Sequence, residues 1–263
     1  MKKLLLLFAL LPLFASCDSV DKDDRYIEVE DAPLQRRVLL EEFTGQRCTN
    51  CPTAHAVIEK LEEQYGNDLI VVSIHAGNFG IPASDGGLMQ EEGDIYAAQW
   101  NIKAFPAGVV DRTGGEMTLD GWAGAIRQDG SYPSPMELNL HASLSHDNKT
   151  INVTSEVTSP ESAKASLQLW VVENGLIGFQ IDGGTRLYDY EHNNVFRGCV
   201  NGLWGQEFEI GAGGTLNFDN SVAVYTNDEP GYEITSWNVD ELYIVGFVYN
   251  DSGVLVVNRV KVD

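Results

Sequence analysis

Two cysteines separated by two residues are the clearest chemical feature of this sequence. Cys48 and Cys51 stand at the start of a segment with helical periodicity. Cys48 is therefore expected beside the unpaired N–H groups and the positive dipole end of a helix. That position, together with the charge of Arg47, lowers a thiol pKa from about 8.5 toward neutrality. The spacing predicts that Cys48 attacks a substrate disulfide and that Cys51 resolves the mixed disulfide.

Three other uses of a Cys-x-x-Cys pair compete with this interpretation. A zinc site needs two further ligands, and His55 is the only nearby candidate, so no metal centre is expected. A c-type haem site needs a histidine directly after the second cysteine, where Pro52 stands. An inert structural disulfide stays open as an alternative, because exported proteins fold in an oxidising compartment. No cofactor is expected.

The segments around the cysteine pair alternate between strand and helix patterns. Residues 69–74 form a continuous β-branched run, as in a strand buried on both faces. Apolar residues between 54 and 65 recur at spacings of three and four, which indicates an amphipathic helix. The expected strands are 37–43, 69–74 and 107–111, the expected helices are 53–65, 91–100 and 119–128, and a loop is expected at 76–90. Residues 34–131 therefore read as an α/β domain.

The composition changes after residues 132–136, where two closely spaced prolines predict a linker. Short alternating segments follow, separated by turns rich in Gly, Asn and Asp, with no helical pattern between them. The expected strands are 137–145, 150–158, 166–172, 205–210, 215–226, 242–250 and 254–262. Residues 137–263 are therefore expected to form an all-β, immunoglobulin-like sandwich domain.

The N-terminus carries the pattern of an export signal. Two lysines precede an apolar run at 4–15, and the segment ends in Phe-Ala-Ser before Cys17, which resembles the lipobox of bacterial lipoproteins. We expect residues 1–16 to be removed, Cys17 to be acylated and residues 17–33 to form an acidic tether. An ordinary cleaved signal remains an alternative. The acidic residues behind Cys17 resemble the export signal of surface lipoproteins in Bacteroidetes-type bacteria, whereas Asp18 would mean inner-membrane retention under the enteric rule.

Charge excludes one class of partner. The 263 residues contain 17 Lys and Arg against 39 Asp and Glu, a net charge of −22. A protein this acidic is not expected to bind nucleic acid. The cysteine outside the pair and the signal, Cys199, is read as a buried small hydrophobe.

The order strand, cysteine pair, helix, strand, helix, then Ala-Phe-Pro and a further strand resembles a thioredoxin fold over residues 34–131. The resemblance implies a cis peptide bond before Pro106, which would face the cysteine pair and shape the substrate groove. A simple proline at a strand start is the alternative. Phe105, next to Pro106, and Arg47, next to the first cysteine, are expected to contact substrate.

The same resemblance gives roles to residues of the first strand. Glu42 lies where thioredoxins carry a buried carboxylate that relays protons to the resolving cysteine. Glu41 would take its place if the register shifted by one residue. His75, at the end of the second strand, is expected to tune the thiolate or contact substrate, with a capping or surface role as the alternative. Arg47 replaces the usual tryptophan before the first cysteine, so the redox potential is open.

The whole layout resembles the Omp28-type outer-membrane lipoproteins of Bacteroidetes, through the segments 39–52, 105–112 and 192–205. The expected function is a lipid-anchored envelope thiol–disulfide oxidoreductase that acts on proteins with thiols or disulfides. The alternative is a surface adhesin or binding lipoprotein in which the disulfide is only structural and the sandwich contacts an envelope or host surface partner. The expected location is the outer membrane, with the chain attached through Cys17 and displayed at the cell surface.

Overall fold

The computed structural model describes residues 33–263, which form one compact unit. The predicted signal segment, the acylated Cys17 and all but the last residue of the acidic tether lie outside the described residues. No helix within 33–263 is long and apolar enough to cross a membrane.

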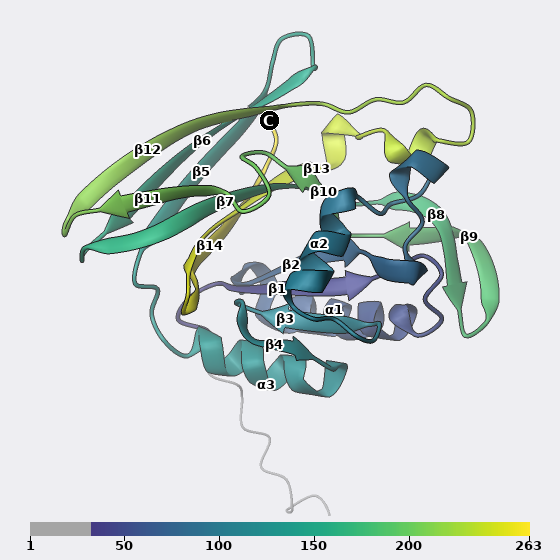
Figure 1. The fold of residues 1–263 in the computed structure, drawn as a ribbon, viewed down its shortest axis with the longest axis horizontal. Coiled ribbons are helices and arrows are strands. Elements are labelled where there is room, and N and C mark those ends of the chain that lie inside the picture. Colours follow the sequence, from purple (N-terminus) through teal and green to yellow (C-terminus); the bar gives the residue numbers. More distant parts are fainter. Residues whose placement is uncertain (1–32) are drawn as a thin grey trace, which may run out of the picture. The chain divides into compact units, whose positions relative to one another are not determined.

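Fourteen strands and three α-helices make up the described part of the chain (Figure 1). The helices are α1 (Cys51–Tyr65), α2 (Glu91–Gln99) and α3 (Leu119–Gly130). The strands are β1 (Val38–Thr44), β2 (Leu69–His75), β3 (Ala107–Val110), β4 (Thr113–Met117), β5 (Glu137–Leu144), β6 (Thr150–Ser159), β7 (Ala163–Glu173), β8 (Leu176–Asp182), β9 (Thr185–His192), β10 (Val195–Cys199), β11 (Gln206–Ile210), β12 (Gly214–Ala223), β13 (Leu242–Asn250) and β14 (Gly253–Lys261). The structure is thus mostly β with few helices, and every strand and helix expected from the sequence is confirmed within a few residues at its ends.

A nine-stranded mixed sheet is the main structural layer. Its order is β14-β13-β7-β10-β2-β1-β3-β4, and β11 pairs with the far part of β7. β1 runs parallel to β2 and antiparallel to β3, so the three strands nearest the cysteine pair are adjacent. All residues of β1 and β2 are buried, including Glu41 and Glu42 of β1, whereas the sequence of β2 is mostly apolar.

The expected boundary at 132–136 does not end this sheet. Those residues do connect α3 to β5 without forming a strand, but β10 from the second half pairs with β2 through Val195 and Ser73. The amide of Ser73 also donates to the carbonyl of Asn194 at 2.7 Å. Without β10, β2 would present an unpaired edge, which folded proteins usually cover. The two halves therefore share one sheet and are not separate layers.

Three large cores fill the space around the sheets, and a fourth, smaller cluster contains Leu88, Leu176 and Val195. One lies under α1 and α3 and one lies on the α2 side of the nine-stranded sheet. The third lies where the three-stranded sheet β12-β6-β5 packs against β7, β11 and β13. The second half is therefore built by sheet-on-sheet packing, as the alternating pattern predicted.

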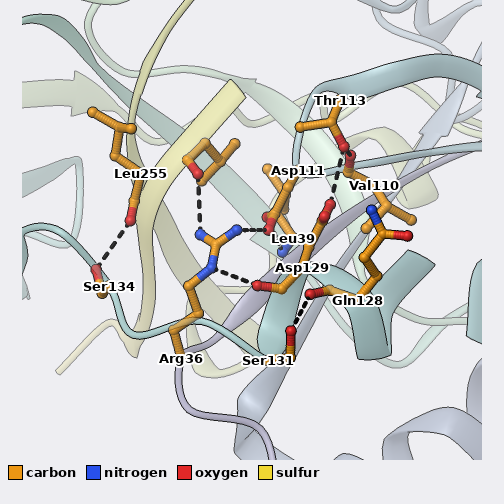
Figure 2. A network of polar contacts seen from close by, with 11 residues as sticks. Arg36, Leu39, Val110, Asp111, Thr113, Gln128, Asp129, Ser131, Ser134 and Leu255 are labelled. Atoms are coloured by element: carbon orange, nitrogen blue, oxygen red, sulfur yellow. Dashed lines mark hydrogen bonds and ion pairs between the residues drawn. The ribbon is translucent and has the colours of Figure 1, made fainter. Parts of the chain in front are cut away.

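A polar network holds the start of β1 against α3 and β14 (Figure 2). Arg36 donates to the carbonyls of Asp129 at 2.9 Å and Val254 at 3.0 Å, and its guanidinium also pairs with Asp111. The other carboxylate oxygen of Asp111 accepts from the amide of Leu39 at 2.8 Å. One arginine thus ties together segments from both ends of the described chain.

Candidate functional site

The two cysteines of the predicted redox pair form a disulfide, Cys48–Cys51. Cys51 is the first residue of α1, and Pro52 lies in the first turn, where its missing N–H costs no helical bond. Within this described helix, Asn50 makes no side-chain capping bond and the first turn holds no acidic residue. The N-terminal amides and dipole of α1 are therefore not neutralised by the helix's own side chains.

The predicted attack by Cys48 on a substrate disulfide requires an accessible sulfur, but Cys48 is buried in this disulfide form. Cys48 is 2% exposed and Cys51 is 0% exposed. The reason is local, since the β8–β9 hairpin, a separate two-stranded sheet, lies against the cysteine loop (Figure 1). The amide of Ile181 donates to the carbonyl of Gln46 at 2.9 Å, and the amide of Gly183 donates to that of Thr49 at 3.1 Å.

One buried side chain joins the hairpin to the cysteine loop. Gln180 on β8 is 0% exposed, and its Nε2 donates to the carbonyl of Cys48 at 3.0 Å and to that of Gly45 at 3.4 Å. From the loop side, Gln46 Nε2 donates to the carbonyl of Phe179 at 3.2 Å. Breaking these contacts is required before the hairpin can leave the disulfide.

Replacement of Gln180 with alanine is expected to speed reduction of the disulfide by dithiothreitol about 30-fold. Two lost hydrogen bonds of roughly 1 kcal/mol each lower the cost of lifting the hairpin, and about 1.4 kcal/mol corresponds to a factor of ten. The rate is measured without denaturant, by labelling the released thiols. Gln168→Ala is the matched control, because Gln168 on β7 is equally buried but donates to Gly202 instead. Equal rates in the two variants would contradict a covering role for β8.

Pro106 directly precedes β3, beside the end of β1 from which the chain continues to the cysteines. The Phe105–Pro106 peptide bond is cis, as the resemblance implied. Ala107 pairs with Phe43, so Pro106 falls opposite Thr44, the last residue of β1 before the cysteine loop. The ring of Phe105 packs against that of Phe79 with centroids 5.5 Å apart. The structure thus places the cis-proline segment next to the start of the loop.

Two of the three predicted substrate contacts share an open cleft. Arg47 is exposed, and both Arg47 and Phe105 line a cleft of about 770 Å³ that is also lined by Met89 and by Ala98 of α2. The third, His75, is 2% exposed and lines a different cavity. His75 therefore cannot reach a substrate in the cleft in this conformation.

Glu42 lies beneath α1, on the side of the sheet that carries the cysteine pair. Its side chain is 0% exposed, and Oε1 lies 3.3 Å from Nε2 of His55, while Oε2 has no hydrogen-bond partner within residues 33–263. His55 Nε2 also lies 3.1 Å from Oγ1 of Thr44, and Nδ1 lies 2.6 Å from the hydroxyl of Tyr190 on β9. A buried carboxylate, a histidine and a phenol thus form one chain of contacts.

Two more histidines complete what we call the polar cluster. Its members are Glu42, Thr44, His55, His75, Tyr190 and His192. The rings of His75 and His192 lie 5.5 Å apart, and those of Tyr190 and His192 lie 5.0 Å apart. Although three histidines are present, no three His, Cys, Asp or Glu residues of the described chain are arranged to hold a metal ion.

The three histidines of the polar cluster differ in pKa because their surroundings differ. Burial lowers the pKa of His55, but the Glu42 carboxylate, its contact with the ring and Glu59 raise it by more, so the pKa lies above 6.5. Burial, reinforced by His192, holds the pKa of His75 well below its ordinary value, and burial lowers that of His192 to about 4. Burial also raises the pKa of Tyr190 to about 12. His55 is therefore the histidine of the cluster that gains a proton most readily near neutral pH.

The strand register settles which glutamate faces the cysteine helix. Glu41 is also fully buried, but it lies on the opposite face, where its Oε1 accepts from Arg112 Nε at 2.6 Å. The Arg112 guanidinium lies 4.6 Å from the ring centroid of Phe247 and 4.5 Å from that of Tyr249. Glu41 thus belongs to a structural ion pair, and Glu42 keeps the position that the resemblance gave it.

His55, Tyr190 and the hairpin were missed at the sequence level. His55 stands four residues after Cys51, which is one helical turn, so the two residues share a face of α1. The hairpin had a signal too, because Gly183 and Gly184 form a two-residue turn with positive φ angles of 52° and 90° between paired Asp182 and Thr185. Nothing local to Tyr190 predicts its contact with His55.

Cys199 lies apart from the disulfide and is half-buried among aromatic residues. Its Sγ lies 3.2 Å from the hydroxyl of Tyr96, and burial raises the thiol pKa to about 11. A thiol with a raised pKa is a poor nucleophile at neutral pH. These contacts agree with the reading of Cys199 as a small packing residue.

Two solved structures share this fold at low sequence identity. HBP35 of Porphyromonas gingivalis is 16% identical, with a TM-score of 0.67 over 88% of this chain and 76% of that chain. A protein of Agrobacterium tumefaciens is 12% identical, with a TM-score of 0.50 over 87% of this chain and 96% of that chain. No curated protein matches the chain.

A family match covers the second part of the chain, which includes the β8–β9 hairpin. The sequence profile of the family described as outer membrane protein Omp28 matches residues 93–263. The match starts within α2, after the cysteine pair, and includes β8 and β9. Since it covers more than half of the chain, this protein belongs to the Omp28 family of outer membrane proteins.

Proposed function

We propose that this protein is a thiol–disulfide oxidoreductase of the cell envelope that acts on protein substrates. The observation that carries the proposal is the Cys48–Cys51 disulfide directly before α1, with the cis peptide bond of Pro106 at the neighbouring strand end. A lipid on Cys17 would hold the chain on the outer membrane, at the cell surface. The family description as an outer membrane protein supports that location.

The proposed architecture is a thioredoxin-like part over residues 34–131, joined to an immunoglobulin-like β-sandwich. Parallel β1 and β2, antiparallel β3, and a cysteine pair between β1 and α1 support the first assignment. The packing of β5 and β6 against β7 and β13 supports the second. The sheet shared by the two parts is an addition to this scheme.

In the proposed reaction, a client thiolate attacks the sulfur of Cys48. A bond forms between the client sulfur and Cys48, the Cys48–Cys51 bond breaks, and Cys51 leaves as a thiolate that takes up a proton. A second client thiolate then attacks the bonded client sulfur and releases Cys48. The client dithiol is oxidised to a disulfide, and the cysteine pair is reduced to a dithiol by the same two electrons. The reverse sequence reduces a client disulfide.

Electrostatics around Cys48 favour it as the reacting cysteine. A thiolate there would lie near the uncapped N-terminus of α1, whose first turn carries no acidic side chain in the described structure. Arg47 adds a positive charge at the adjacent position. Cys51 is the first residue of α1, three positions after Cys48, and is fully buried, which suits the resolving cysteine.

An extended client segment is proposed to enter along the cleft of Arg47 and Phe105. The cleft volume of about 770 Å³ accommodates several side chains, and its walls combine a charge, an aromatic ring and the backbone near Gly80. Because the hairpin lies against the cysteine loop, the client must displace part of β8 before it reaches Cys48. Covering of the disulfide in the absence of a client would limit exchange with unrelated thiols.

The proposal is tested by insulin reduction with the full chain. After reduction by dithiothreitol without denaturant, the protein is expected to accelerate the precipitation of insulin chains above the rate with dithiothreitol alone. Cys199→Ser is the control and is expected to retain this activity, because its thiol lies outside the proposed site. A disulfide that resists reduction until the protein is denatured would refute the function.

The burial of Cys48 favours a second candidate function, in which the disulfide is only structural and the protein binds a partner. At 2% exposure, the disulfide has the environment of a structural cross-link, and the protein would then act as a surface adhesin or binding lipoprotein. Its sandwich would contact an envelope or host surface partner through protein surface, since the net charge of −22 disfavours nucleic acid. The insulin experiment separates the two functions, because an inert cross-link gives no acceleration.

A further inference from the structure

We propose that His55 is a positioning residue that carries protons between solvent and buried Glu42 during exchange at Cys51, with Tyr190 of the hairpin as its outer partner. This inference rests on the proposed function and adds a route for the proton that the cysteine pair exchanges. His55 acts through Glu42 and is not proposed to contact a sulfur atom.

The first argument is that Glu42 has a single titratable neighbour in contact. Its side chain is 0% exposed, its Oε1 lies 3.3 Å from His55 Nε2, and its Oε2 has no partner within the described chain. A buried carboxylate that gives a proton to a departing thiolate must be reprotonated from outside. The His55 ring is the titratable group placed to do this, because its side chain is 18% exposed.

The second argument is the connection of the ring to both sides. Nε2 faces Glu42 and Thr44, whereas Nδ1 faces the Tyr190 hydroxyl at 2.6 Å. A neutral ring that donates from Nε2 accepts from Tyr190 at Nδ1, and a protonated ring donates from both nitrogens. Since the Tyr190 pKa is raised to about 12, the phenol stays neutral and can fill either role. The ring can therefore gain a proton on its outer side and release one on its inner side.

The third argument is a small cavity on the outer side. It measures about 60 Å³ and is lined by His55, Tyr190, His192 and residues of α1 and β2. This volume holds roughly two waters. Water in it would connect Nδ1 or Tyr190 to the surface beside Glu59. A proton path from solvent to Glu42 thus needs no movement of the sheet.

Charges from every neighbouring element act on His55. The carboxylates of Glu42 on β1 and Glu59 on α1 raise the pKa of His55, and its ring also interacts with the imidazoles of His75 on β2 and His192 on β9. Glu62 and Glu191 line the adjoining cavity, and Asp182 on β8 acts on Tyr190. The carboxylates favour the protonated ring and the imidazoles disfavour it when charged. The balance places the pKa of His55 above 6.5, where the ring exchanges protons near neutral pH.

In the balanced step, the Cys48–Cys51 bond breaks as a client or dithiothreitol thiolate bonds to Cys48. The Glu42 carboxylate takes a proton from protonated His55 and passes it to the Cys51 thiolate, and His55 then takes one from solvent. When the pair is oxidised again, the proton leaves by the same groups in reverse. The electrons move only between sulfur atoms.

The test is the pH dependence of disulfide reduction by dithiothreitol in the full chain, which requires no client. After correction for the thiolate fraction of dithiothreitol, the wild-type rate is expected to fall as pH rises through the His55 pKa, because protonated His55 is consumed. His55→Gln is expected to lower the reduction rate near pH 6 about tenfold and to make the rate independent of pH in this range. The tenfold effect is smaller than the roughly 10²–10⁴-fold typical of direct acid–base catalysis, because His55 acts through Glu42. His141→Gln, at an exposed position on β5, is the matched control with the wild-type profile.

Tyr190→Phe provides a second variant that removes only a hydroxyl. Loss of the acceptor at Nδ1 is expected to shift the fall in rate to lower pH without removing it. The proposal is overturned if the reduction rate of His55→Gln still falls with rising pH as in the wild type. It is also overturned if Tyr190→Phe shows no shift in the pH of this fall. The Tyr190→Phe measurement remains possible if His55→Gln does not fold. Insulin activity with an unchanged His55→Gln profile leaves the proposed function standing and removes the relay. The predicted profiles without insulin activity would support the relay and remove the function.

Discussion

Serine in place of Cys48 is expected to reduce exchange with protein disulfides to the uncatalysed rate, whereas serine in place of Cys51 is expected to trap the client. The two sulfurs are bonded to each other, but they differ in position, since Cys51 lies inside α1 and Cys48 precedes it. With Cys48 alone, the mixed disulfide forms and no neighbouring thiol resolves it. Turnover is therefore lost in both variants, but for different reasons.

The measurement is non-reducing gel electrophoresis after incubation of each reduced variant with insulin. Cys51→Ser is expected to give a covalent adduct that dithiothreitol releases, and Cys48→Ser is expected to give none. An adduct that forms with Cys48→Ser and not with Cys51→Ser would reverse the assignment of the two cysteines. Adducts in neither variant would favour the structural cross-link and the binding function.

The largest effect on stability is expected at Arg197, at the centre of β10. Its side chain and that of Glu173 are both 0% exposed, and Nε lies 3.1 Å from Oε2 of Glu173. Its Nη2 also donates to the carbonyl of Thr235 at 2.6 Å. Arg197→Met leaves the Glu173 carboxylate buried without its counter-charge, which costs roughly 3–5 kcal/mol of unfolding free energy.

Urea unfolding measures this loss, and two further variants interpret it. Lys164→Ala removes a surface pair, in which the side chains of Lys164 and Glu207 are 68% and 77% exposed, and is expected to cost less than about 1 kcal/mol. Arg197→Met combined with Glu173→Leu removes both charges and is expected to regain part of the loss. A cost below about 1 kcal/mol for Arg197→Met alone would show that the buried pair does not hold β10 in place.

Much of the site could be predicted because its signals are local. The disulfide, the helix that follows it and the buried strands around it depend on residue spacing within about thirty positions of the chain. The expectation for Pro106 came from the resemblance to a thioredoxin fold, whereas alternation along β1 placed Glu42 and Glu41 on opposite faces.

What could not be predicted depends on contacts between distant residues. Tyr190 meets His55 across 135 positions, and Gln180 meets Cys48 across 132. The strand β10 completes β2 by backbone bonds, which any side chain can accompany, so no residue type marks the pairing. For this reason no sequence signal indicated that strands from both halves join the nine-stranded sheet.

The pairing of β10 with β2 has a mechanical consequence for the proposed chemistry. Because β10 and β2 belong to one sheet, bending between the sandwich and the cysteine loop would break backbone hydrogen bonds. A polypeptide bound by the sandwich would then lie at a fixed distance from the sulfur atoms, and this distance would be determined by the spacing of the strands between them. Selection among clients would then depend on the distance between the client thiol and the segment bound by the sandwich, as well as on the residues around that thiol.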